Sequence, residues 1–197
     1  SLLTHKEQQF IYLTGAAGTG KSTLIENVKS KCPLKKIVVA PTGVAALNIG
    51  GSTINSAFRI GFDIFPIIQE SKDPKFKKLL KNIDLLIIDE ISMVRAPMLD
   101  AISQTLKLYR QSSEPFGGIH VLACGDLFQL PPVVKDDESI IIDEKYQSVY
   151  FFSSESYREI KSPSLFELTY SFRQKDDAEF YSLLNDIRLG INLEVAI

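Results

Sequence analysis

Short apolar runs alternate along this 197-residue chain with segments whose apolar residues recur at helical spacing. Runs of this kind are typical of strands that are covered on both faces. They occupy residues 11–14, 36–40, 84–89 and 119–124, with a further candidate at 165–168. The clearest helical spacing extends from about Ala96 to Arg110. The pattern predicts an α/β fold, with a mostly parallel sheet flanked by helices and a site at the carboxyl ends of the strands.

Local signals predict the remaining elements. A helix should end near Lys31, and a short helix over 44–49 should be closed by two glycines. Residues 59–82 carry no clear pattern. The other expectations are a loop at 53–58, a solvated acidic loop at 135–138, short strands at 140–142 and 149–152, and a helix at 176–189.

Composition and charge narrow the class of protein. Hydrophobic residues make up 45% and charged residues 23%, as in ordinary globular domains, and the net charge is −2. Nucleic-acid binding would therefore need a local basic track. Five lysines between Lys72 and Lys81 are either such a track or a solvated helix face. The chain begins and ends as if cut from a longer polypeptide.

The compartment is inferred from the cysteines and the apolar runs. Two cysteines without a disulfide framework favour a reducing environment. No run approaches the length of a membrane span, so we expect no membrane partner. The expected location is intracellular: cytoplasmic if bacterial, nuclear or mitochondrial if eukaryotic.

The first apolar run leads into a glycine-rich segment that reads GAAGTGKST and opens a helix. This is the strand, G-x-x-x-x-G-K-[ST], helix arrangement of a phosphate-binding loop. Backbone N–H groups and the helix N-terminus would hold phosphates, Lys21 would neutralise them, and Ser22 would be a Mg²⁺ ligand. The predicted nucleotide-binding residues are Gly15, Ala16, Ala17, Gly18, Thr19, Gly20, Lys21, Ser22 and Thr23.

Polar residues at three later strand ends could act on the same phosphates. Asp89 could hold Mg²⁺ opposite Ser22, and Glu90 could orient or deprotonate a water, which favours hydrolysis. Gln129 suits sensing of a γ-phosphate, although alone it is weak evidence. Arg173 is either a residue that reaches the transferred phosphoryl group or a surface salt-bridge residue. The candidate catalytic residues are Lys21, Glu90 and Gln129.

Five segments in this order resemble the Pif-type (petite integration frequency) DNA helicases, superfamily-one motors related to the RecD-like enzymes. They are GAAGTGKST, VVAPTGVAALNIGGSTINSAF, LLIIDEISMVRAPMLDAI, GDLFQLPPV and LTYSFRQKDDAEFYSLLNDIRLG. The resemblance implies that 1–197 is a single RecA-like P-loop NTPase domain, the N-terminal motor half. It implies ATP and Mg²⁺ as cofactors, 5′-to-3′ translocation on single-stranded DNA and duplex unwinding. It also implies that Gln129 and Arg173 contact the γ-phosphate, and only through this resemblance is Arg173 a fourth candidate catalytic residue.

The resemblance also implies partners and a DNA-contacting surface. The partners are single-stranded DNA, forked or structured duplex DNA, and a second RecA-like domain of the same polypeptide, which is not in this chain. Free amides and hydroxyls suit phosphates, and Phe58 could stack on a base, although the residues alone also favour a core position for it. The implied DNA-binding residues are Pro41, Thr42, Gly43, Thr53, Asn55, Ser56 and Phe58.

The chain departs from the family pattern at Asn55, where the family usually has histidine, and in lacking the upstream glutamine segment that reads adenine, unless it precedes Ser1. Two other functions use the same loop and stay open at this point. One is a phosphotransferase acting on a small molecule, which would need a lid and an acceptor pocket. The other is a nucleotide-gated binding module without productive turnover.

Overall fold

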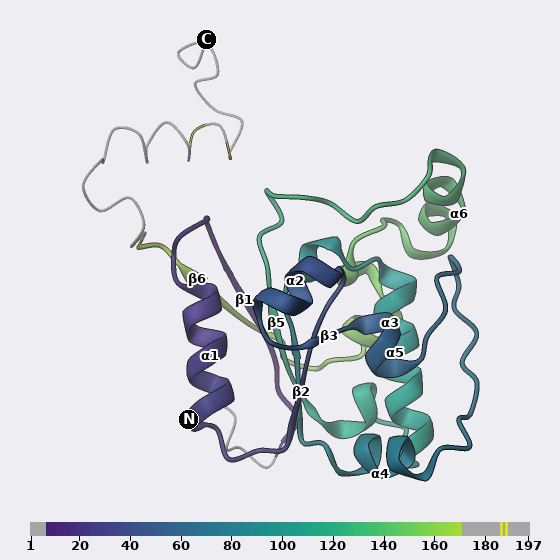
Figure 1. Cartoon of the computed structure of the whole chain (residues 1–197). Coiled ribbons are helices and arrows are strands. Elements are labelled where there is room, and N and C mark those ends of the chain that lie inside the picture. Colours follow the sequence, from purple (N-terminus) through teal and green to yellow (C-terminus); the bar gives the residue numbers. More distant parts are fainter. Residues whose placement is uncertain (1–6, 171–185, 187, 189–197) are drawn as a thin grey trace.

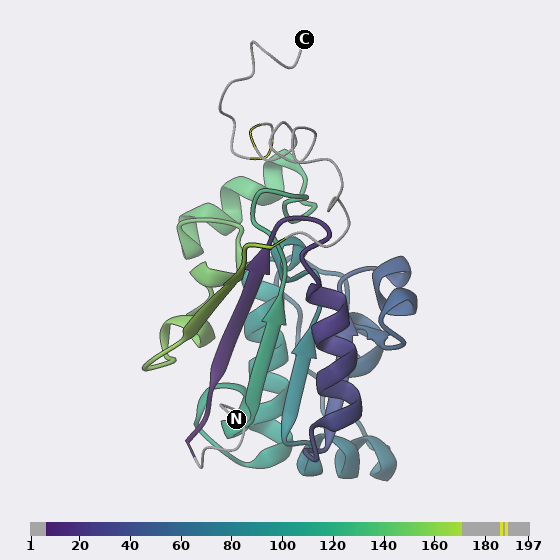
Figure 2. The same cartoon turned by 90° about the vertical axis from the view of Figure 1, so that its left-hand side faces the viewer.

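The computed structural model describes residues 7–170, Asp186 and Arg188. Its centre is a six-stranded sheet with the order β3-β2-β4-β5-β1-β6, in which every neighbouring pair is parallel. Figure 2 shows the arrowheads of neighbouring strands pointing to the same edge. The strands are β1 (Phe10–Gly15), β2 (Lys36–Ala40), β3 (Ser52–Thr53), β4 (Leu85–Ile88), β5 (His120–Cys124) and β6 (Ser164–Leu168).

Helices cover both faces of the sheet (Figure 1). On one face lie α1 (Lys21–Lys31) and the odd-numbered residues of β1, including Ile11 and Leu13, in one apolar cluster. On the other face lie α3 (Ile54–Phe58), α4 (Pro74–Asn82) and α5 (Ala96–Arg110), against Phe10 and Tyr12 of β1. This alternation explains the continuous apolar runs of β1, β2, β4 and β5, because these four strands have buried side chains on both faces, whereas the edge strands β3 and β6 do not.

The other helical elements lie in the connections. They are α2 (Gly43–Asn48), η2 (Ile91–Met93), η3 (Pro115–Gly118), α6 (Asp136–Tyr146), η4 (Phe151–Ser153) and α7 (Glu155–Arg158). No helix in the described part of the chain is both long and apolar enough to cross a membrane. The predicted α/β class, the parallel sheet and the helix at 96–110 are confirmed.

Three local predictions are wrong, each because a capping or packing contact favours a helix. Residues 53–58 are not a loop: Thr53 pairs in β3, and its Oγ1 accepts a hydrogen bond from Ser56 N at 3.2 Å, which caps α3. Residues 135–142 are not an acidic loop followed by a strand. They begin α6, whose buried Ile142 and Tyr146 have helical spacing.

The predicted strand at 149–152 is also absent. Tyr150 makes an isolated bridge with Arg95, and Phe151 begins the 3-10 helix η4 with its ring buried. The helix expected at 176–189 lies outside the described residues, apart from Asp186 and Arg188, which are both helical.

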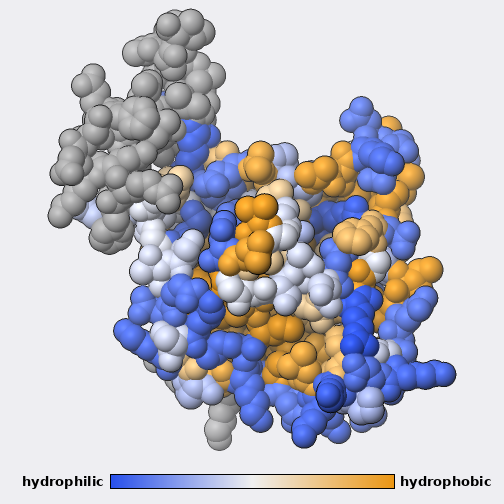
Figure 3. Space-filling view, viewed as in Figure 1, coloured by the Kyte–Doolittle hydropathy of each residue, from blue (hydrophilic) through white to orange (hydrophobic). Residues whose placement is uncertain are grey.

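Four of the five clustered lysines lie on α4, and Lys72 lies just before it. The helix is at the amino-terminal end of β4, far from the edge that carries the phosphate-binding loop (Figure 1). The helix buries Phe76 and Leu80, whereas Lys75, Lys78 and Lys81 face solvent. This region is blue at the base of Figure 3, and apolar surface lies higher, over α2. The cluster is therefore a solvated helix face.

Candidate functional site

The glycine-rich loop connects β1 to α1 and is shaped by backbone conformations that other residues rarely adopt. Gly20 has φ 95° and precedes α1 without any side chain that caps the helix, so the first N–H groups of α1 remain open. Gly15 has φ 150°, and a Cβ there would lie 2.6 Å from the carbonyl oxygen of Leu168. A helix N-terminus with free N–H groups is a site for anions such as phosphate.

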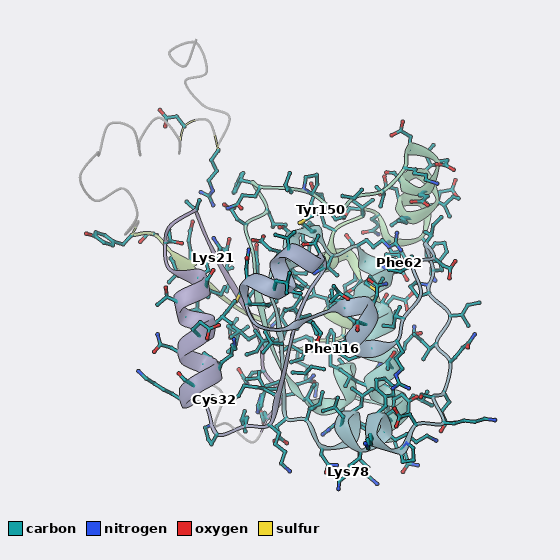
Figure 4. The ribbon with its side chains drawn as sticks, in the orientation of Figure 1. Lys21, Cys32, Phe62, Lys78, Phe116 and Tyr150 are labelled. Carbon is teal, nitrogen blue, oxygen red and sulfur yellow. The ribbon has the colours of Figure 1, made fainter. Side chains whose placement is uncertain are left out.

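Lys21 begins α1 and its side chain folds back over the loop (Figure 4). Its Nζ donates to the carbonyl oxygens of Gly15 at 2.6 Å and Ala16 at 3.1 Å. Burial lowers the pKa of Lys21, opposed by the nearby carboxylates of Asp126, Glu90 and Asp89. Lys21 is therefore a half-buried cation that three acidic side chains surround at the phosphate-binding loop.

Asp89 and Glu90 follow β4, which lies next but one to β1 in the sheet. Asp89 is 8% exposed, and Glu90 has the left-handed backbone conformation φ 51°, ψ 45°. This conformation is uncommon for a residue with a Cβ and is found at functional sites. Burial raises the pKa of both carboxyl groups, and for Glu90 the neighbouring Asp89 adds to it, whereas Lys21 lowers both.

The oxygen donors at this edge fit a magnesium ion that is bound partly by phosphate and water. Among the described residues no group of three or more His, Cys, Asp or Glu could hold a metal. Mg²⁺ commonly uses one or two protein oxygens together with substrate phosphates. The hydroxyl of Ser22, an exposed residue in the first turn of α1, and the carboxylate of Asp89 provide that kind of donor set.

One pocket of about 1000 Å³ brings most of the predicted nucleotide site together. The loop and the start of α1, from Ala17 to Leu24, form one part of its lining, and Glu90 and Gln129 form another. This volume suits a ligand of nucleotide size. Gly15 and Ala16 contact the pocket indirectly, because their carbonyl oxygens accept hydrogen bonds from Lys21, which lines it. Arg173 lies outside the described residues, so its predicted role stays a prediction.

An ionic network that the sequence reading missed lies beside Gln129. The carboxylate of Asp126 has no exposed surface and forms an ion pair with Arg188, with Nε and Oδ2 2.9 Å apart. It also accepts a hydrogen bond from Gln129 Nε2 at 3.0 Å. Two sequence signals could have indicated this network. Asp126 stands three residues before Gln129, and Arg188 is the basic residue of the family-like segment LNDIRLG.

The predicted DNA-contacting segments leave β2 and β3 at the same edge of the sheet. Thr42 and Thr53 cap short helices, and each hydroxyl oxygen accepts a backbone N–H at 3.2 Å. Gly43 and Ser56 are exposed, and Pro41 is half-buried. These residues therefore lie next to Asp89 at the same edge of the sheet, because β2 pairs with β4.

One of the predicted DNA contacts, Phe58, is wrong, and a second, Asn55, stays a prediction although its side chain also makes structural hydrogen bonds. Phe58 is 2% exposed and lies in the main core cluster, so its ring cannot stack on a base in this structure. The Nδ2 of Asn55 donates to the carbonyl oxygens of Ile60 and Gly61, at 3.1 and 3.0 Å. Asn55 thus has a structural function in ordering the chain after α3, although it also lines a surface pocket.

That second pocket, of about 250 Å³, has an exposed aromatic ring at its rim. Phe62 is 83% exposed and is labelled in Figure 4. Arg95 holds the backbone there, since its Nη2 donates to the carbonyl oxygen of Phe62 at 2.7 Å. Pro41, Thr42 and Asn55 line the same pocket. The sequence reading missed Phe62 because residues 59–82 carry no periodic pattern.

Comparison with known proteins identifies the family. The sequence profile of the PIF1-like helicases matches residues 2–195. The chain belongs to the PIF1-like helicase family. It is 39% identical over 186 residues to the ATP-dependent DNA helicase PIF1 of Mus musculus and 38% identical over 186 residues to that of Homo sapiens. These alignments cover 92% of this chain but only 27% and 28% of the two relatives.

Solved PIF1-like structures share the fold. The Pif1 helicase from Bacteroides in complex with ADP-AlF3 and single-stranded DNA is 40% identical, with a TM-score of 0.88 over 95% of this chain and 44% of that chain. The Pif1 helicase from Candida albicans is 36% identical, with a TM-score of 0.73 over 91% of this chain and 40% of that chain. The fold is thus that of a RecA-like helicase domain, and this chain spans less than half of either solved chain.

Proposed function

We propose that this chain is the ATP-hydrolysing, DNA-contacting half of a 5′-to-3′ DNA helicase motor. The observation that carries the proposal is that one pocket is lined by the phosphate-binding loop together with Glu90 and Gln129. A binding module would need only the loop, whereas an acid that can activate water and an amide that can sense a γ-phosphate serve hydrolysis. The PIF1-like relatives, which are ATP-dependent DNA helicases, support this function.

The three predicted catalytic residues that the structure describes, Lys21, Glu90 and Gln129, each receive a role that their position allows. The loop amides and the Lys21 ammonium group hold the phosphates of ATP, and the carboxylate of Glu90 accepts a proton from the attacking water. Gln129 orients that water or contacts the γ-phosphate. Mg²⁺, when bound through Ser22 and Asp89, supplies positive charge that stabilises the phosphate oxygens. Burial of the two acids costs less once they face this charge.

Single-stranded DNA would cross the edge of the sheet over the ends of β2 and β3. Exposed amides and hydroxyls at Gly43 and Ser56 suit backbone phosphates, and the ring of Phe62 offers a flat surface for a base. The Bacteroides Pif1 structure with bound single-stranded DNA supports this assignment through its fold similarity. Forked duplex DNA is a further proposed partner, which a similar solved structure of Pif1 helicases, described as unwinding forked double-stranded DNA, supports.

A second RecA-like domain of the same polypeptide is proposed to complete the nucleotide site. This chain corresponds to 44% of the Bacteroides chain, which leaves room for another domain of similar size. Residues 1–197 alone should therefore hydrolyse ATP slowly, because the missing half supplies part of the charge stabilisation. An intracellular, reducing location remains part of the proposal.

The test uses the full-length protein and measures ATP hydrolysis with and without a saturating single-stranded oligonucleotide. We expect strong stimulation by the oligonucleotide. We also expect unwinding of duplexes that carry a 5′ single-stranded tail but not of duplexes that carry only a 3′ tail. A rate of ATP hydrolysis that the oligonucleotide does not change would contradict the proposed motor function. Transfer of phosphate to nucleosides would instead indicate a small-molecule phosphotransferase, and nucleotide binding without turnover would indicate a gated binding module.

A further inference from the structure

Asp126 is a fully buried carboxylate whose two oxygens are shared among three groups. Oδ1 accepts hydrogen bonds from Phe128 N at 3.2 Å and from Arg188 Nη2 at 3.0 Å. Oδ2 accepts from Gln129 Nε2 at 3.0 Å and from Arg188 Nε at 2.9 Å. A buried charge is tolerated only when it is paired and hydrogen-bonded in this way. The cluster is therefore a built structural unit next to the nucleotide pocket.

The carboxylate determines which way the Gln129 side chain faces. An ionised carboxylate only accepts hydrogen bonds, so the amide nitrogen of Gln129 must point toward Asp126. The carboxamide oxygen and the second N–H then remain for groups in the pocket that Gln129 lines. Without Asp126 the side chain would rotate freely, because Gln129 is otherwise exposed. Holding a reacting group in one orientation before the reaction raises the rate.

Arg188 reaches this cluster from 62 residues further along the chain. Its guanidinium group makes a two-point contact with Asp126 and lies 4.7 Å from the ring centre of Phe128. The side chain is 14% exposed. Burial opposes ionisation of Asp126, but hydrogen bonds from Arg188, Phe128 N–H and Gln129 hold its pKa below the ordinary value. Arg188 thus stabilises both the charge on Asp126 and the loop that carries Gln129.

We propose that Asp126 and Arg188 are positioning residues that hold Gln129 in its productive orientation beside the phosphate-binding loop. Arg188 acts through Asp126 and not through a contact with ATP. The pair also connects the chain at residue 188, on the way to the proposed second domain, to the residue that senses the γ-phosphate. This inference rests on the proposed ATPase function.

The experiment is a double-mutant cycle in the full-length protein, with DNA-stimulated ATP hydrolysis as the assay. Gln129→Ala, Arg188→Met and the double variant are compared for kcat and KM. We expect each single change to lower kcat by at least about tenfold and the KM for ATP to change by less than about threefold. If Arg188 acts through Gln129, the double variant has the kcat of Gln129→Ala within about twofold.

Two further variants separate positioning from stability. Arg188→Lys keeps the charge but loses the two-point contact, so its kcat should lie between those of wild type and Arg188→Met. Arg59 provides a matched control, because it pairs with Asp73 at 2.6 Å and lies over the ring of Phe76 at 4.3 Å, away from the pocket. Arg59→Met should leave kcat within about twofold of wild type. Thermal melting shows that each variant is folded.

The outcomes distinguish this inference from the function on which it rests. If wild type shows no DNA-stimulated hydrolysis, the proposed function fails. If wild type is active but the effects of Arg188→Met and Gln129→Ala multiply in the double variant, Arg188 acts independently and the inference is overturned. The inference is also overturned if Arg188→Lys has the wild-type kcat. This variant tests the two-point contact even if Arg188→Met does not fold.

Discussion

Two phenylalanines four residues apart, Phe58 and Phe62, have opposite environments and should respond in opposite ways to truncation. Phe58 is 2% exposed in the core, whereas Phe62 is 83% exposed at the rim of a pocket beside the DNA-contacting segments. Replacing each by alanine therefore separates folding from DNA binding. Phe58→Ala tests the core position, and Phe62→Ala tests the proposed stacking surface.

The expected magnitude for Phe58 follows from its burial. Truncation of a buried phenylalanine to alanine costs about 3–5 kcal/mol in the free energy of unfolding, because it removes apolar contacts and leaves a cavity. This is a large share of the roughly 5–15 kcal/mol that holds a typical domain folded. The midpoint of urea denaturation should fall clearly. The DNA affinity of the molecules that remain folded should change little.

The expected magnitude for Phe62 follows from stacking. Truncation at so exposed a position should change the free energy of unfolding by no more than about 0.5 kcal/mol. Loss of one base–aromatic stack costs about 1–3 kcal/mol, which raises the Kd for DNA roughly 5- to 150-fold. Fluorescence anisotropy of a labelled single-stranded oligonucleotide, titrated with the full-length protein at constant salt, measures this change.

Phe166→Ala is the control, because Phe166 is 42% exposed on β6, at the opposite edge of the sheet from β3. It should bind DNA as wild type does. Wild-type DNA affinity in Phe62→Ala would refute the stacking surface. A Phe58→Ala variant that kept full stability but lost DNA binding would show that Phe58 leaves the core to contact DNA.

Three further predictions concern the nucleotide site. Glu90→Gln should lower kcat by at least about 100-fold and leave ATP binding intact, since the amide keeps the shape of the side chain but cannot accept the proton. Titration with a labelled ATP analogue measures binding. A variant that hydrolyses ATP at the wild-type rate would show that Glu90 does not have this role. Lys21→Ala should weaken ATP binding itself, measured by the same titration, because its ammonium group lies against the carbonyl oxygens of the loop. Removal of Mg²⁺ with EDTA should abolish hydrolysis, and Asp89→Asn should raise the Mg²⁺ concentration needed for half-maximal turnover, whereas an unchanged requirement would argue against Asp89 as a ligand.

Most of the nucleotide site could be predicted from the sequence because its residues lie in short local motifs at strand ends. The loop and Lys21 follow β1, and Asp89 and Glu90 follow β4. Strands that run parallel place their carboxyl ends at one edge, so recognising the strands was enough to bring these motifs together. Gln129 was placed correctly in the same pocket for this reason.

The short helix α2 was predicted, but α3, α6 and η4 were mispredicted where a few contacts outweigh the local pattern. The three isoleucines at 140–142 look like a strand, but α6 buries only Ile142 and Tyr146 and leaves Ile140 and Ile141 exposed. A segment this short fits both the helical and the strand spacing of apolar residues, and which structure forms depends on what packs against it. The 3-10 helix η4 has the same cause, since the ring of Phe151 packs against Tyr12 and Tyr157.

Local sequence was enough to propose the chemistry of this protein, because phosphate binding and water activation depend on residue types at fixed local spacings. The tertiary structure decided which side chains are available. Local pattern cannot show that Phe58 is buried while Phe62 is exposed, since burial depends on α4 and α5 covering that face of the sheet. Nor can it show that Arg188 pairs with Asp126, because only folding brings together two residues 62 positions apart.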